Sequence, residues 1–363
     1  MILFENDSNS AAFYFAAEEY IMRYLKPDVA TLMLWSTGDT IMIGANQITE
    51  AECDLAYARE AGIEVVRRSS GGGSIYTDHG TLQVTVIQPF GADDDCRNIA
   101  RESITGPIIG ALASRKVKAS AEGRNDIVIE GRKVSGIAQY VKDGYICSHC
   151  SLLFGTDLEK LERSLTVDRS KYETKAIASA RARVANITEY IAEKDMQSFI
   201  DELTESFNTH CHCESFNTHC HCEEHRNEAI QNMDCRAPLR SARNDEMKNQ
   251  RFSADELAEI ETIMNEKYLN PEWTFGREPA FTYTNKKRFH GGLLEVFLDV
   301  KGGVIKNARI NGDFLSLMPV GGLEEILEDV PHREDALAEA LGAVDVKQYL
   351  GSLGASELLE TLL

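Results

Sequence analysis

Three consecutive glycines, Gly71–Gly73, separate two stretches of strand-forming residues, and this arrangement limits the possible folds of the chain more than any other feature. Residues 63–68 predict a strand, and residues 82–86 alternate apolar and polar side chains as a half-buried strand does. Glycines let a backbone approach a ligand closely, and their N–H groups can hold an anion. Because neither Gly-Lys-Ser/Thr nor a helix follows, the segment is no P-loop and no dinucleotide fingerprint. On the glycines alone, a hairpin turn with surface arginines is an equal alternative.

The rest of the chain shows helical and strand patterns in irregular order. Helices are predicted at 11–25, 50–61, 97–114, 157–164, 171–180, 195–206, 253–268 and within 322–363. Strands are predicted as a pair at 29–35 and 40–43, and as hairpins at 127–129 with 133–141 and at 291–300 with 304–310. A length of 363 residues is typical of two domains, and we place a second, smaller one at about 275–363.

A perfect nine-residue tandem repeat, 205–213 copied as 214–222, interrupts this pattern. Two copies of nine residues are too few for a repeat architecture, and the polar segment after them has no sustained periodicity. We interpret 207–247 as an inserted loop of low complexity, similar to translated repetitive DNA elements, without a catalytic role.

Composition narrows the possible partners. The net charge is −20, which argues against non-specific binding to nucleic acid or to an anionic membrane. The sequence contains no apolar run of about 18 residues, and its N-terminus does not resemble a signal peptide. We therefore expect a cytoplasmic protein with reduced thiols.

A second glycine-containing segment joins Gly123-Arg124-Asn125-Asp126 to a strand that carries Lys133, Ser135 and Gly136. Alternation places Lys133, Ser135 and Ile137 on one face of this strand. A lysine on a buried strand needs a partner, and an anionic ligand could provide it. An edge lysine in solvent is the simpler interpretation of this segment taken alone.

Two cysteine patterns suggest metal or redox chemistry. Cys147 and Cys150 have CxxC spacing, but an apolar run follows them and the chain has no second CxxC. The His-Cys-His-Cys repeats offer ligands suited to Zn²⁺ or Cu⁺. A metal- or redox-sensing protein is therefore one alternative, although it leaves the other motifs unexplained. A basic stretch from Asp168 to Arg183 is either a solvated helix face or a mobile loop that closes over a polyanion.

Taken in order, these segments resemble the lipoate–protein ligase family. The matching pieces are 67–73, 123–126, 132–136, His149 with Leu152-Leu153, 181–187, 273–281 and 312–314. The resemblance covers about 1–206 and 250–363. It implies an α/β (mixed α+β) fold, with a biotin/lipoate ligase-like mixed sheet flanked by helices. It also implies a catalytic domain at 1–270, interrupted at about 207–247, and a small C-terminal α+β accessory domain at 275–363.

The resemblance also implies an activity. Lipoate and ATP would give lipoyl-AMP and pyrophosphate, and the lipoyl group would pass to a specific lysine of an acceptor. The acceptors implied are lipoyl domains of 2-oxoacid dehydrogenase E2 subunits and the glycine cleavage H protein. The cofactors implied are ATP and Mg²⁺.

Site residues follow from the same resemblance. Lys133 would be catalytic and would contact both ATP and lipoate. The implied ATP contacts are Arg68, Gly73, Ser74, Ile75, Tyr76, Lys133, Asn125 and Asp126, and Asp126 would hold Mg²⁺. The implied lipoate contacts are Lys133, Ser70, Gly72 and His149.

The sequence departs from the family pattern at Thr77, Thr81 and Cys150, where the family usually has His, Asn and Gly. The runner-up function is an octanoyl or lipoyl transferase of the same superfamily, which would use a cysteine thioester. The stretches 119–122 and 165–168, where related transferases carry that cysteine, contain no thiol. Cys150 adjoins His149, but alternation along a strand would point the two side chains to opposite faces.

Overall fold

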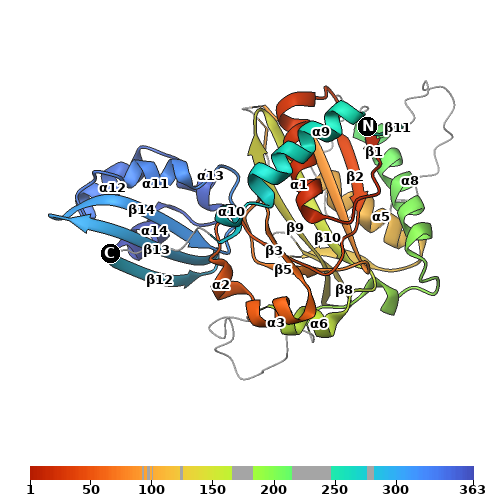
Figure 1. Ribbon diagram of the computed structural model, residues 1–363, viewed down its shortest axis with the longest axis horizontal. Coiled ribbons are helices and arrows are strands. Elements are labelled where there is room, and N and C mark those ends of the chain that lie inside the picture. Colours follow the sequence, from red (N-terminus) through yellow and green to blue (C-terminus); the bar gives the residue numbers. More distant parts are fainter. Residues whose placement is uncertain are drawn as a thin grey trace, which may run out of the picture.

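The computed structural model describes residues 1–91, 94–95, 99, 101–122, 126–165, 183–214, 247–275 and 282–363. Within these residues, a large N-terminal part built on a mixed sheet lies beside a smaller C-terminal part (Figure 1). The strands of the large sheet are, in spatial order, β11 (Lys248–Gln250), β1 (Ile2–Phe4), β2 (Thr31–Trp35), β6 (Thr81–Pro89), β10 (Tyr145–Leu153), β9 (Arg132–Lys142), β8 (Asp126–Ile129) and β7 (Ala119–Glu122). Strand β1 pairs in parallel with both its neighbours, and the other pairs are antiparallel.

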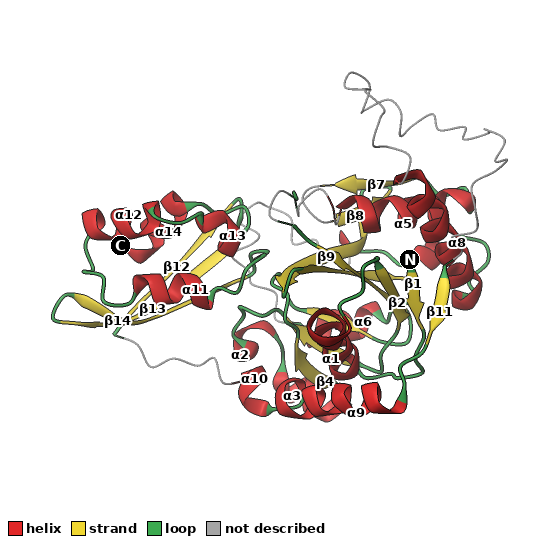
Figure 2. Cartoon of the chain, turned by 90° about the horizontal axis from the view of Figure 1, so that it is seen from above, coloured by secondary structure: helices red, strands yellow, loops and turns green. Residues whose placement is uncertain are grey.

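Helices cover both faces of this sheet (Figure 2). One face packs against α5 (Gly106–Ser114) and α8 (Met196–Glu214), and the other against α1 (Ala11–Tyr20) and α9 (Ala254–Ile263). Helix α1 begins at Ser10, whose hydroxyl accepts a hydrogen bond from the Phe13 amide, and a π-helical turn, η1 (Ile21–Leu25), continues it. The predicted helix at 11–25 is confirmed, and so is the predicted fold class.

The predicted pairing of 29–35 with 40–43 is wrong. Strand β2 belongs to the large sheet, whereas β3 (Thr40–Ile43) lies between β4 (Glu64–Arg67) and β5 (Ile75–Thr77) in a separate small sheet. The turn between β2 and β3 therefore carries the chain from one sheet to the other. Helices α2 (Thr49–Glu52) and α3 (Leu55–Ala61) connect β3 to β4, and α3 ends at Gly62 with a φ of +70°. The segment between β4 and β5 contains Gly71–Gly73 and is called the glycine segment below.

The hairpin of β8 and β9 matches its prediction. Glu130 and Gly131 form its turn, and both have positive φ angles, 51° and 76°. A two-residue hairpin turn whose twist matches that of the flanking strands requires positive φ angles at both of its residues.

Lys133 at the start of β9 pairs with Val128, whereas Asp126 at the start of β8 pairs with Gly136, so the Lys133 side chain extends along the hairpin to reach Asp126. A bulge shifts the register at Val128, so Lys133 and Ser135 pair with adjacent residues of β8 and lie on opposite faces. The predicted common face of Lys133 and Ser135 is therefore wrong.

The C-terminal part is a three-stranded antiparallel sheet covered by helices. Its strands are β12 (Tyr283–Phe289), β13 (Gly292–Lys301) and β14 (Val304–Gly312), and its helices are α11 (Gly321–Leu327), α12 (Glu334–Gly342), α13 (Val346–Leu350) and α14 (Ala355–Leu362). The sheet and the helices of the C-terminal part form an apolar core of their own. The remaining described elements are α6 (Leu158–Ser164), the short helices η2 (Arg101–Thr105), η4 (Ile187–Glu189) and η7 (Met264–Tyr268), and α10 (Pro271–Phe275). No helix in the described ranges is both long and apolar enough to span a bilayer.

The predicted loop at 207–247 is wrong at its N-terminal end. Helix α8 continues to Glu214, so it includes the first copy of the repeat. Phe199, Leu203 and Phe207 recur every four residues along α8, and all three are fully buried against the sheet. The first copy therefore completes a core helix. Residues 215–246, with the second copy, lie outside the described residues.

We expect residues 215–246 to be dispensable and Phe207 to be essential for stability. Replacing 215–246 by a shorter Gly/Ser linker should change the melting temperature little, because halving a flexible loop changes the closure free energy by only ~0.6 kcal/mol. Phe207→Ala should lower the free energy of unfolding by about 3–5 kcal/mol, because it leaves a cavity in the core. Thermal melts of both variants test this. A linker variant that unfolds like Phe207→Ala would contradict the prediction.

Candidate active site

One cavity of about 280 Å³ lies between the glycine segment, the large sheet and α6. It is lined by Phe15, Trp35, Met42, Arg68, Gly72, Gly73, Ser74, Ile75, Tyr76, Gln83, Lys133, Ser135, Gly136, Ile137, Ala138, His149, Ser151, Leu153, Leu161, Leu165, Val184 and Leu315. The lining combines aromatic and aliphatic side chains with the ammonium of Lys133 and the residues of the glycine segment. A mostly apolar cavity with a few polar groups is typical of a site for an amphipathic small molecule.

Arg68 organises the glycine segment. Its guanidinium donates to the carbonyl oxygens of Gly71 and Gly73, both at 2.8 Å, and to the Ser70 hydroxyl at 3.0 Å. Burial lowers the pKa of Arg68 to about 10, against the opposing effect of Glu18, so the side chain is charged at neutral pH. These hydrogen bonds hold the backbone of the glycine segment in one conformation. Gly72 has a φ of +90°, and Gly73 has open space where a Cβ would lie.

Lys133 reaches across β9 into the cavity. Its ammonium forms an ion pair with Asp126 at 2.7 Å, and both side chains are about one-third exposed. A Cβ on Gly136 would lie 3.1 Å from the Lys133 Nζ atom, so the glycine leaves room for the ammonium above the strand. The cation therefore lies over Gly136, and both residues line the cavity.

His149 belongs to a buried hydrogen-bonded chain under the cavity. Its Nε2 atom contacts the Ser70 hydroxyl, and its Nδ1 atom lies 3.3 Å from a carboxylate oxygen of Glu18. Because Arg68 donates to the Ser70 hydroxyl, that hydroxyl can donate to Nε2, and Nδ1–H then donates to Glu18. Tyr140 and Thr85 also donate to Glu18. This chain links the sheet and α1 to the glycine segment.

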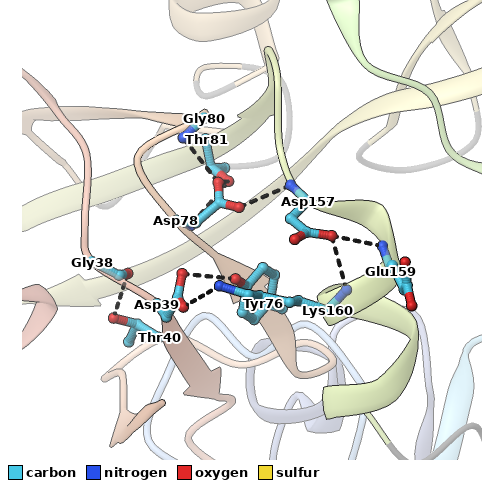
Figure 3. Close-up of polar contacts among 10 residues, drawn as sticks. All are labelled: Gly38, Asp39, Thr40, Tyr76, Asp78, Gly80, Thr81, Asp157, Glu159 and Lys160. Atoms are coloured by element: carbon cyan, nitrogen blue, oxygen red, sulfur yellow. Dashed lines mark hydrogen bonds and ion pairs between the residues drawn. The ribbon is translucent and has the colours of Figure 1, made fainter. Parts of the chain in front are cut away.

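Helix α6 forms one wall of the cavity through Leu161, and two acidic groups hold it in place (Figure 3). Asp39 accepts hydrogen bonds from the Tyr76 hydroxyl at 2.9 Å and from Lys160 at 2.5 Å. Asp78 accepts one from the amide of Asp157, which caps α6. Tyr76 thus anchors Asp39 through its hydroxyl, while the residue belongs to the apolar core of the small sheet with Ile41 and Ile43.

The C-terminal part contacts the glycine segment directly. The Gly72 amide donates to the Phe314 carbonyl at 2.9 Å, and Leu315 lines the cavity. A Cβ on Gly71 would lie 2.7 Å from that same carbonyl oxygen. On the other side, the Gly312 amide donates to the Asn46 carbonyl at 2.8 Å. Glycine at position 71 is thus required for the close approach of the two parts.

The three cysteines within the described residues, Cys53, Cys147 and Cys150, are all buried and form no disulfide with one another. His149 lines the cavity, whereas Cys150 lies in the core on the other face of β10, as predicted. Burial raises the pKa of Cys150 to about 12, against the opposing hydrogen bond from Ser135. Cys147 also lies on the face opposite to Cys150, so the CxxC spacing does not bring the two thiols together.

The structure brings most of the predicted site residues together. Those that line the cavity are Arg68, Gly72, Gly73, Ser74, Ile75, Tyr76, Lys133 and His149. Ser70 does not line the cavity, but its hydroxyl is hydrogen-bonded to Arg68 and to His149. Asp126 forms an ion pair with Lys133. Asn125 and most of the basic stretch at 168–183 lie outside the described residues. Thr77 and Thr81 are buried hydrogen-bonding residues that do not line the cavity.

The sequence analysis missed Glu18 and Gln83. Glu18 lies on a helix whose apolar periodicity gave no reason to bury a carboxylate, yet its side chain is fully buried. Gln83 alternates with leucine and valine in β6, which suggested a solvent face. The structure instead covers both faces of β6, and Gln83 lines the cavity.

A pH effect follows from Glu19, which lies beside this network. Its carboxylate contacts Lys142 and lies 2.7 Å from the ammonium of Lys267. Burial alone would raise the pKa of Glu19, but the two lysines outweigh burial and hold that pKa at about 2, below its ordinary value of 4.5. Burial lowers the pKa of Lys267 despite the same contact with Glu19, so of the two groups only the carboxyl has a pKa shift that favours its charged form.

We expect Glu19 to stabilise the protein by up to about 3 kcal/mol above pH 4.5, at about 1.4 kcal/mol per pKa unit. A carboxyl group with a depressed pKa loses this contribution as the pH falls from about 4.5 to about 2. The difference in unfolding free energy between the wild type and Glu19→Gln should therefore be largest near pH 7 and shrink below pH 4.5. Urea unfolding at several pH values tests this, and a difference independent of pH would contradict it.

Comparisons with known proteins show the family of this chain. The model of the lipoyl protein ligase A/B catalytic domain matches residues 10–208, and that of the bacterial lipoate protein ligase C-terminus matches residues 278–362. The chain is 32% identical to the lipoate-protein ligase LplJ of Bacillus subtilis, over 100% of both chains. It is 29% identical to lipoate–protein ligase 1 of Staphylococcus aureus, over 96% of this chain and 95% of that one. The chain therefore belongs to the lipoate–protein ligase family.

Solved structures show the same fold. The structure of P. falciparum LipL1 in complex with lipoate has a TM-score of 0.75 at 20% identity and covers 99% of both chains. A lipoate-protein ligase A bound with ATP has a TM-score of 0.59 at 21% identity, over 76% of this chain and 98% of that one.

Proposed function

We propose that this protein activates lipoate with ATP, giving lipoyl-AMP and pyrophosphate, and then transfers the lipoyl group to a lysine of an acceptor domain. The observation that carries the proposal is that Lys133 lines the same largely apolar cavity as the glycine segment. The apolar side chains of the lining fit an acyl tail, and the ammonium fits its carboxylate. The names of the curated relatives support the same activity.

Activation requires two anions to meet. The lipoate carboxylate attacks the α-phosphorus of ATP, the bond to the pyrophosphate group breaks, and pyrophosphate leaves with its electron pair. Lys133 reduces the repulsion between the carboxylate and the α-phosphate and stabilises the charge that develops between them. The backbone of Gly73–Ile75 would hold the nucleotide, with Arg68 fixing that backbone.

Mg²⁺ fits this site through Asp126. The ion is usually bound by one or two carboxylates together with substrate phosphates. Asp126 presents a carboxylate beside Lys133, where phosphate oxygens would also lie. Bound there, the ion would neutralise phosphate charge, and Lys133 would turn from Asp126 to the substrates.

In the second step, the acceptor lysine attacks the acyl carbonyl and AMP leaves. We propose lipoyl domains of 2-oxoacid dehydrogenase E2 subunits and the H protein as acceptors, acting in the cytoplasm. A structure of an archaeal bipartite lipoate protein ligase with its E2 lipoyl domain supports this class of acceptor. A transferase with a cysteine thioester is disfavoured, because the described thiols are buried and none lines the cavity.

The purified protein should release pyrophosphate with lipoate and ATP, and should release AMP once an acceptor lipoyl domain is added. Mass spectrometry should then find the lipoyl group on the acceptor lysine. A covalent acyl adduct on the enzyme, or acyl transfer from a carrier-protein thioester without ATP, would overturn the proposal. Stoichiometric bound metal without ligase activity would instead favour a metal sensor.

A further inference from the structure

Gln83 places an unusual polar group in the floor of the cavity. The side chain is 3% exposed, and its carbonyl oxygen accepts a hydrogen bond from Ser151 at 2.6 Å. Its Nε2 atom is buried and has no hydrogen-bond partner among the described residues. Because a buried N–H without an acceptor is costly, an occupant of the cavity that offers one is favoured.

The register of the sheet locates this amide. Gly136 on β9 lies opposite Ser151 on β10, and Ser151 lies opposite Gln83 on β6, which in turn pairs with Trp35 on β2. Paired residues of neighbouring strands project to the same face of a sheet. These four positions form a row across the floor, and the ammonium of Lys133 lies over its first member, Gly136. Gln83 is two strand spacings further along, roughly 10 Å.

That separation matches the length of the substrate. This step depends on the proposed function, in which the carboxylate of lipoate lies at Lys133. An extended chain of five carbons and the first ring bonds spans roughly 8 Å. The dithiolane ring then lies over Ser151 and Gln83, with Trp35 beyond it.

We propose that Gln83 is a specificity-determining residue, whose Nε2 atom donates a hydrogen bond to a sulfur of the dithiolane ring. Sulfur is a weak acceptor, but it is the only kind of acceptor that this end of the substrate has. Any apolar tail of suitable size would pack against Phe15, Trp35 and Met42. Gln83 distinguishes a sulfur-containing acid from a saturated fatty acid such as octanoate, which would leave its N–H unpaired. Ser151 is a positioning residue that orients the amide.

The first test changes the enzyme. We expect the wild type to prefer lipoate over octanoate in kcat/KM for adenylate formation, and Gln83→Met to reduce that preference about tenfold. Gln83→Glu keeps an oxygen for Ser151 and removes the donor, so it should also lose the preference. Gln139→Met is the matched control. Its amide donates to Ser148 outside the cavity, so the preference should not change. An unchanged ratio in Gln83→Met, or equal losses with both acids, would overturn the proposal.

The second test changes the ligand and needs no variant. 5-Cyclopentylpentanoate has the shape of lipoate with methylene groups in place of the sulfurs. By calorimetry, the wild type should bind it about tenfold more weakly than lipoate. Equal affinities would overturn the role of Gln83, whereas the proposed function would stand as long as lipoyl-AMP forms. Absence of adenylate with every acid would instead overturn the proposed function.

Discussion

Lys133→Ala should reduce the rate of lipoyl-AMP formation by at least about 10²-fold and leave the fold intact. Removing one charged group that stabilises a transition state in an enclosed site typically costs ~3 kcal/mol, which corresponds to that factor. The variant should stay folded, because the ion pair with Asp126 is about one-third exposed, and such pairs contribute ~1 kcal/mol or less. Pyrophosphate release with lipoate and ATP measures the rate.

A surface lysine provides the control for this variant. Lys306 pairs with the exposed Asp329 in the C-terminal part and lies outside the cavity, so Lys306→Ala removes a similar ion pair without touching the site. It should retain normal pyrophosphate release. Near-normal release by Lys133→Ala as well would remove Lys133 from the mechanism.

Motifs that depend on local geometry were predictable from the sequence. The two-residue turn at Glu130 and Gly131 fixed the β8–β9 hairpin, and therefore the neighbourhood of Lys133 and Asp126. The alternation along β10 correctly placed His149 and Cys150 on opposite faces. In each case the property depends on residues that are close in the sequence, so periodicity and turn chemistry are sufficient.

Features that depend on distant residues were not predictable. Strands β2 and β3 are neighbours in sequence but belong to different sheets, because β6 and β4 are better partners from further along the chain. A polar residue such as Gln83 looks the same in a solvent-facing strand and in the floor of a cavity. The end of α8 was missed because Phe207 is the one aromatic residue in the first copy of the repeat, and its period continues from residues before the repeat.

Arg67 and Arg68 are adjacent in sequence, and the structure buries both of them and separates their roles. Arg67 is fully buried and does not line the cavity. Its guanidinium donates to the backbone oxygens of Gly44, Ala45, Gln47, Trp273 and Thr274 and to the Thr49 hydroxyl, at 2.7–3.3 Å. It therefore joins the loop after β3 to α10, the last described helix before the C-terminal part.

We expect Arg67→Met to lower the free energy of unfolding by about 3–5 kcal/mol, because it leaves several buried carbonyl groups without donors. Arg67→Lys should recover only part of this loss, since one ammonium has three donors and cannot span both segments as the planar guanidinium does. The contrast with Lys133→Ala is the critical measurement: that variant should be stable and inactive, whereas Arg67→Met should melt early but release pyrophosphate well below its melting temperature. An Arg67→Met protein with wild-type stability and no activity would show that Arg67 binds the nucleotide after all.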